Sequence, residues 1–125
     1  MNTNTLNYND VVKFMKDFGI DVLNKFDELI IDMRTNTYTT IGDSKDIDDV
    51  KTRVVYALCR PIGKGLEVHH ANRLLNKVNA YFNVNLTRSD MLSMYAELCY
   101  PSKLSEFKDF IKRGFPIEEI KRHED

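Results

Sequence analysis

Apolar residues recur at helical spacing in several separate stretches of this chain, and glycine, proline or asparagine ends each stretch after a few turns. The first stretch covers residues 10–18, with Asn9 as the predicted N-cap and Gly19 as the C-terminal stop. Short amphipathic helices can bury their apolar faces only by packing on one another. The sequence therefore predicts a compact bundle of short helices, and it contains no heptad or longer repeat that would indicate a coiled coil or a solenoid.

Two further helices are predicted in the middle of the chain. One opens at Ile47, after a group of acids that suits the positive end of a helix dipole, and it ends at residues 60–65. The other begins at Leu66 or Glu67 and ends at the polar break of residues 83–85. Each carries an apolar stripe, so both are expected to face the core.

The last two helices have explicit start and stop signals. Thr87 and Asp90 have the spacing of a capping box, Pro101 ends the helix that follows, and Ser102 is predicted to cap the next one. Gly114 ends that helix in the position that a Schellman motif requires. Such a motif would bring together two aromatic rings, those of Phe110 and Phe115.

A β-hairpin is predicted before these helices, because residues 29–33 and 38–41 are rich in β-branched and aromatic side chains around a short polar turn. Asp21 could cap a helical turn in front of it, either as a separate short helix or as a continuation of the first. The predicted fold class is mainly α (α+β), a compact bundle of five to six short helices with one β-hairpin near residues 29–41. Residues 1–125 are expected to form a single globular domain.

Composition points to a cytoplasmic protein with no membrane contact. The polar N-terminus has neither a basic nor an apolar signal region, and the longest apolar runs are far shorter than the roughly 20 residues that cross a bilayer. Cys59 and Cys99 lie in apolar helical patterns, where free cysteine acts as a small buried side chain. We therefore expect a reducing compartment.

Charge is distributed unevenly along the chain, although the net charge is only -1. The first 50 residues hold 5 Lys and Arg against 10 Asp and Glu, residues 51–113 hold 11 against 5, and the rest hold 2 against 4. A basic segment between acidic flanks could gather a patch that suits phosphates. The candidates for contact with nucleic acid or phosphate are Lys51, Arg53, Arg60, Lys64, Arg73, Lys77 and Arg88.

No recognisable motif indicates catalysis, a metal or a cofactor. His69 and His70 are adjacent on a helix and should point about 100° apart, which would prevent both from facing one ion as an i, i+4 pair does. Gly63-Lys64-Gly65 lacks the spacing of a phosphate-binding loop. Neither cysteine has a base in its local sequence, although a histidine could reach one through the fold. We therefore predict no catalytic residues, no metal and no cofactor.

Protein docking is the other route to function. Large side chains are abundant for this length, and aromatic residues outside a core favour partner contact. The aromatic candidates are Tyr38, Tyr56, Tyr81 and Tyr100. Three acids, Asp46, Asp48 and Asp49, could meet a basic groove on a partner.

These features predict a small non-catalytic accessory protein that docks on a larger protein of replication, transcription or defence. Frequent Asn, Lys, Ile and Asp are typical of an AT-rich genome, such as that of a low-GC bacterium, its phage or a mobile element. The alternative is a DNA-associated regulator or replication accessory protein that uses the basic helical face. A third hypothesis is an enzyme with an unrecognised cysteine site.

Overall fold

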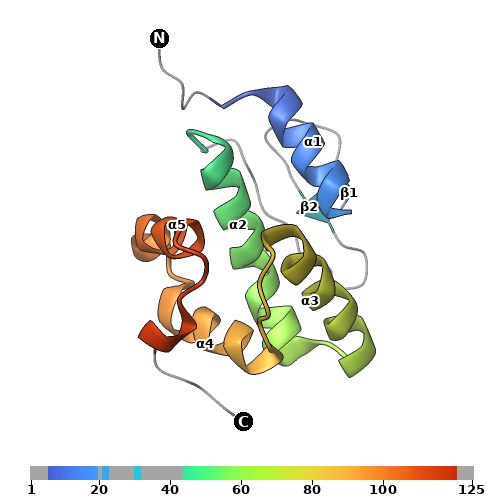
Figure 1. Cartoon of the computed structure of the whole chain (residues 1–125), viewed down its shortest axis with the longest axis vertical. Coiled ribbons are helices and arrows are strands. Elements are labelled where there is room, and N and C mark those ends of the chain that lie inside the picture. Colours follow the sequence, from blue (N-terminus) through green and yellow to red (C-terminus); the bar gives the residue numbers. More distant parts are fainter. Residues whose placement is uncertain (1–5, 20, 23–29, 32–43, 121–125) are drawn as a thin grey trace.

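The structure, a computed structural model, describes residues 6–19, 21–22, 30–31 and 44–120 (Figure 1). Within these ranges the fold is mainly helical, as predicted. In chain order the elements are α1 (Tyr8–Phe18), β1 (Asp21–Val22), β2 (Ile30–Ile31), α2 (Ile47–Arg60), the π-helical turn η1 (Pro61–Gly65), α3 (Val68–Phe82), α4 (Arg88–Leu98), the 3-10 turn η2 (Pro101–Lys103), α5 (Leu104–Lys112) and the 3-10 turn η3 (Ile117–Glu119). Helix α2 runs through the middle of the molecule and contacts α1, α4 and α5.

The first helix is capped earlier in the chain than predicted. Asn7, not Asn9, is the N-cap, and its side chain accepts a hydrogen bond from Asn9 N–H at 2.8 Å. An earlier start adds an intrahelical bond, because Val11 N–H then reaches Asn7 C=O. At the other end Gly19 has φ 83°, the left-handed conformation expected of a C-terminal stop.

The predicted hairpin near residues 29–41 is not supported. Ile30–Ile31 pairs antiparallel with Asp21–Val22, with Asp21 opposite Ile31, and the predicted second strand at 38–41 lies outside the described residues. The helical turn predicted after the Asp21 cap does not include Val22, which pairs with Ile30 as a strand, and the rest of that turn lies outside the described residues. A continuously apolar strand without an Asn-Gly turn specifies neither register nor partner, so contacts elsewhere in the fold decide the pairing.

The break predicted at residues 60–65 is a π-helical turn that continues α2. Arg88, the first residue of α4, fixes this turn: its Nε donates to Ile62 C=O at 2.8 Å and its Nη2 to Leu66 C=O at 3.2 Å. Gly63 lets η1 lie directly on α4, because a Cβ there would be 2.9 Å from Leu92 N. Such close approach of two backbones requires glycine.

Helix α4 begins as predicted, with the capping box of Thr87 and Asp90 complete. The predicted cap at Ser102 is wrong, because Ser102 lies inside η2 and α5 begins after it at Leu104, without a side-chain cap. A residue that is already helical cannot take the extended backbone of an N-cap.

The predicted Schellman motif at the end of α5 is confirmed. Gly114 has φ 88°, its N–H donates to Ile111 C=O at 3.0 Å, and Phe115 N–H donates to Phe110 C=O at 3.1 Å. The Phe110 and Phe115 ring centroids are 6.1 Å apart. The cap thereby turns the chain so that Phe115 re-enters the core.

A row of touching aromatic rings crosses the core from α1 to α5. Neighbouring ring centroids lie 4.9 to 6.4 Å apart. Edge-to-face contacts at these distances add to the energy of burying the rings. In order along the row the rings are Phe18, Phe14, Tyr81, Phe82, Phe115, Phe110 and Phe107.

Both cysteines are buried, as predicted, and their thiols also interact with each other. Burial raises the pKa of the Cys59 thiol, and a hydrogen bond with Cys99 raises it further. Cys99 Sγ lies 3.9 Å from Tyr56 C=O. A buried thiol with a raised pKa is a poor nucleophile, so this pair is part of the packing between α2 and the end of α4.

Candidate docking site

Three of the seven residues predicted to contact phosphate instead interact with other parts of the fold. Lys51 Nζ lies over the Phe14 and Tyr81 rings, 5.8 and 5.3 Å from their centroids. Lys77 Nζ donates to Gly19 C=O at 2.7 Å and so closes the end of α1. The guanidinium of Arg88 holds η1. Their charges stabilise the packing of α1, α3 and α4, which sequence spacing alone does not show.

Arg60, Lys64 and Arg73 remain exposed, and none of them forms an ion pair within the described part of the chain. They come from the end of α2, from η1 and from the second turn of α3. Only these three of the seven predicted cations are thus both exposed and without an ion pair among the described residues.

The acids at the start of α2 are already paired with lysines of α5. Lys108 Nζ lies 2.9 Å from Asp46 Oδ2 and 2.7 Å from Asp49 Oδ1, and Lys112 Nζ lies 3.6 Å from Asp48 Oδ2. Asp46 is also the N-cap of α2 and accepts from Asp49 N–H. This cluster joins α2 to α5, so these acids are not the free contact surface that we predicted.

Acid should weaken this cluster. Burial, the largest single influence, raises the pKa of Asp46, but the hydrogen bond and charge of Lys108, together with the hydrogen bonds from the Asp49 and Asp48 N–H groups, outweigh it and hold the pKa below 3.8. A carboxyl whose pKa is lower in the folded chain stabilises the fold above its unfolded pKa, and this stabilisation is lost as the pH falls through the folded value.

Asp46→Asn tests this contribution, because asparagine keeps the cap and removes the charge. We expect the variant to lose about 1 kcal/mol of unfolding free energy at pH 7. The difference from wild type should shrink towards zero between pH 4 and pH 2 in urea titrations. A difference that stays constant with pH would show that the Asp46–Lys108 pair contributes nothing.

The four tyrosines predicted to contact a partner differ in where they lie in the structure. Tyr38 lies outside the described residues, and Tyr81 belongs to the ring row of the core. Tyr100 is 49% exposed, and Tyr56 is half-buried on α2 with its pKa raised by burial. Tyr56 and Tyr100 therefore remain as surface aromatics, close to Pro101.

Two adjoining pockets lie between α2 and the start of α5. One, of about 260 Å³, is lined by Arg53, Tyr56, Pro101 and Leu104. The other, of about 220 Å³, again includes Arg53 and Leu104. We call their combined lining the Arg53 groove: Lys45, Asp49, Arg53, Tyr56, Pro101, Leu104, Ser105 and Lys108.

Arg53 is the unusual residue of this groove. Its Nε is buried, yet it has no hydrogen-bond partner within the described residues. Leaving a buried donor unsatisfied costs about 1–3 kcal/mol. A group from another molecule that accepts a hydrogen bond here would recover that cost.

Leu104 shares the helical spacing of the core residues of α5, but it is only half-buried and stands outside the core cluster. Pro101 and Ser105 beside it are exposed. The sequence does not identify these three as contact residues. Leu104 in particular has the same helical spacing as Phe107, which is fully buried. Only the position of α2 decides which of the two is covered.

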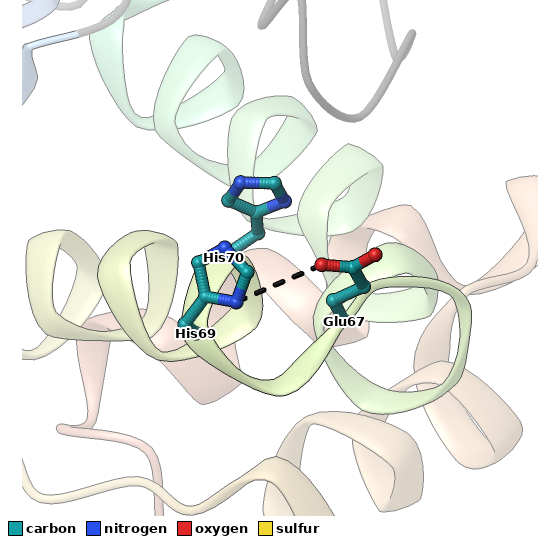
Figure 2. A group of neighbouring side chains, drawn as sticks. All are labelled: Glu67, His69 and His70. Carbon is teal, nitrogen blue, oxygen red and sulfur yellow. Dashed lines mark ion pairs between the residues drawn. The ribbon is translucent and has the colours of Figure 1, made fainter.

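A separate cluster stands at the start of α3. The His69 and His70 rings, predicted to diverge, have centroids 4.0 Å apart, and His69 Nδ1 is 3.7 Å from Glu67 Oε2 (Figure 2). The prediction treated both histidines as part of a regular helix with ideal side-chain directions. At the first turn, rotation of exposed side chains brings the rings together.

Comparisons with protein families, curated sequences and solved structures gave no match to this chain. Among its described helices, none is both long and apolar enough to span a membrane.

Proposed function

We propose that this chain is a non-catalytic binding protein that docks on a larger protein through the Arg53 groove. The observation that carries the proposal is Arg53 itself, whose buried Nε lacks a partner among the described residues and lies between two adjoining pockets. An unsatisfied buried donor destabilises the unbound protein. A partner that accepts the hydrogen bond removes this cost, which favours binding.

The occupant that we infer is a partner segment in which a carboxylate stands next to an apolar side chain. The groove residues include the cations Lys45, Arg53 and Lys108 against the single acid Asp49. Lys108 is bound to Asp46 and Asp49, so Lys45 and Arg53 are the groove cations without an ion pair among the described residues, and Arg53 is the one with a buried, unsatisfied donor. Its planar guanidinium suits a carboxylate, and Tyr56, Pro101 and Leu104 provide apolar contact beside it.

The residue types of the lining also favour binding. The lining contains neither histidine nor cysteine. This supports binding rather than nucleophilic or acid-base catalysis.

Selection from a random peptide phage library tests the proposal. Peptides should be selected on the wild-type chain and counter-selected on Leu104→Glu. Their dissociation constants for each variant are then measured by fluorescence anisotropy. We expect Asp or Glu beside Leu, Ile or Phe among the enriched peptides. Arg53→Met should weaken their binding at least about tenfold, since truncating one side of a buried charge pair costs about 2–5 kcal/mol. Arg60→Met, an exposed arginine on the same helix, is the matched control and should change nothing.

Stability separates a docking role from a structural one. Removing an unsatisfied buried donor should leave the unfolding free energy of Arg53→Met equal to wild type or higher. Peptides that bind Arg53→Met and Leu104→Glu as well as wild type would overturn the proposal. So would salt-sensitive binding of a DNA duplex at about 150 mM salt that Arg60→Met weakens, because phosphate contacts would then carry the function.

A further inference from the structure

The structure points to a second binding site at the start of α3, which shares neither residues nor chemistry with the Arg53 groove. We propose that Glu67, His69 and His70 bind a divalent transition-metal ion of the zinc class. The three residues offer one carboxylate oxygen and two imidazole nitrogens that all lie within 4.8 Å of one another (Figure 2). Imidazole and carboxylate are ordinary ligands of such ions.

Spacing along the chain brings these donors together. Glu67 is the N-cap of α3, and His70 is three residues later, the Glu-x-x-His spacing by which one helical turn presents two ligands to one ion. His69 adds the third donor, with Nδ1 3.7 Å from Glu67 Oε2. Metal–ligand bonds of about 2.0–2.2 Å place tetrahedral donors about 3.3 Å apart, so small side-chain rotations complete the site.

The donors are available for an ion. No side chain of the three makes a hydrogen bond within residues 44–120, and the contact between Glu67 and His69 is longer than a hydrogen bond. The side chains of His69 and Glu67 are 69% and 74% exposed, and His70 is half-buried. Rotation therefore meets little resistance, while the open side leaves coordination positions for water or for a ligand from another molecule.

Two positively charged side chains near the site limit its affinity for a divalent ion. Lys64 lies three residues before Glu67, and Arg73 follows His70 by one helical turn. These cations oppose a divalent ion, and the glutamate offsets only part of that repulsion. We therefore expect micromolar binding, in contrast to the tight closed sites that hold a zinc finger together.

Calorimetric titration of the tag-free chain with Zn²⁺ tests the site, with Co²⁺ visible absorption as a second readout of the ligands. We expect one ion per chain. Glu67→Gln, His69→Ala and His70→Ala should each weaken Zn²⁺ binding at least about tenfold. His123→Ala removes the third histidine of the sequence and serves as the matched control, with binding unchanged. Far-ultraviolet circular dichroism should be the same for all variants.

Three results would overturn the metal site: no saturable heat up to about 1 mM Zn²⁺, binding that survives in the Glu67→Gln and His70→Ala variants, or binding lost in His123→Ala. None of these bears on the Arg53 groove, because the two sites share no residue.

Discussion

Replacement of Phe107 by alanine is expected to lower the free energy of unfolding by about 4 kcal/mol. Phe107 is completely buried and heads the largest fully buried side chains. It lies on α5, which packs on both α2 and α4, and its ring touches Phe110. Truncation removes apolar burial and leaves a cavity that three helices cannot collapse into without moving.

Urea denaturation at 25 °C, followed by circular dichroism, measures this loss. Domains of this size have total stabilities of about 5–15 kcal/mol, so the midpoint should move far or the chain should unfold. Val68→Ala is the control, because Val68 is apolar but 62% exposed, and it should change stability by less than about 0.5 kcal/mol. A loss below about 1 kcal/mol in Phe107→Ala would mean that α5 does not pack as described.

Gly63→Ala should lower the free energy of unfolding by about 2–3 kcal/mol, although it adds only one methyl group. The new Cβ would be 2.9 Å from Leu92 N and 3.0 Å from Leu92 Cα. These are backbone atoms of α4, so no side-chain rotation relieves the overlap. Helix α4 and η1 must separate instead, which strains the bonds from Arg88 to Ile62 and Leu66.

Gly65→Ala provides a matched control two residues away in the same turn. A Cβ at Gly65 would meet only Arg60 C=O, at 3.9 Å, which is ordinary contact. Alanine there should be neutral or stabilising by up to about 1 kcal/mol, because it reduces the freedom of the unfolded chain. Equal losses in both variants would show that the close approach of η1 and α4 is not what selects Gly63.

Three helix ends of this fold are predictable from the sequence, whereas the caps expected at Asn9 and Ser102 are wrong. The Thr87–Asp90 capping box, the Gly19 stop and the Schellman motif at Gly114 all depend on residues within one turn of each other. Their chemistry is complete before any tertiary contact forms. Local signals of this kind can therefore be read directly from the sequence.

Features that depend on distant segments are not predictable in the same way. The partner of Ile30–Ile31 and the π-helical form of η1 are set by contacts many residues apart. Arg88 illustrates the problem: the sequence makes it a candidate for contact with nucleic acid or phosphate, yet its guanidinium donates to the Ile62 and Leu66 carbonyls. Sequence spacing shows where a charge is, but not which acceptor lies opposite it.

The candidate sites are predictable only in part. Arg53 and Tyr56 are expected at a binding surface from the sequence, whereas their neighbours Pro101 and Leu104 come from a segment about 50 residues later. Ideal helix geometry argues against the cluster at Glu67, but side-chain rotation in the first turn of α3 brings His69 and His70 together. Both omissions arise from side-chain positions that periodicity does not determine.

The row of rings between α1 and α5 gives the molecule an internal optical probe. The sequence contains no tryptophan, so ultraviolet absorption above about 275 nm comes from tyrosine, and Tyr81 is the tyrosine set within this row. Excitation absorbed by the phenylalanines can pass along the touching rings to its phenol. Five other tyrosines also emit, so the part of the emission excited through phenylalanine that is lost in Tyr81→Phe reports, without any label, whether α1 and α5 pack on the same core.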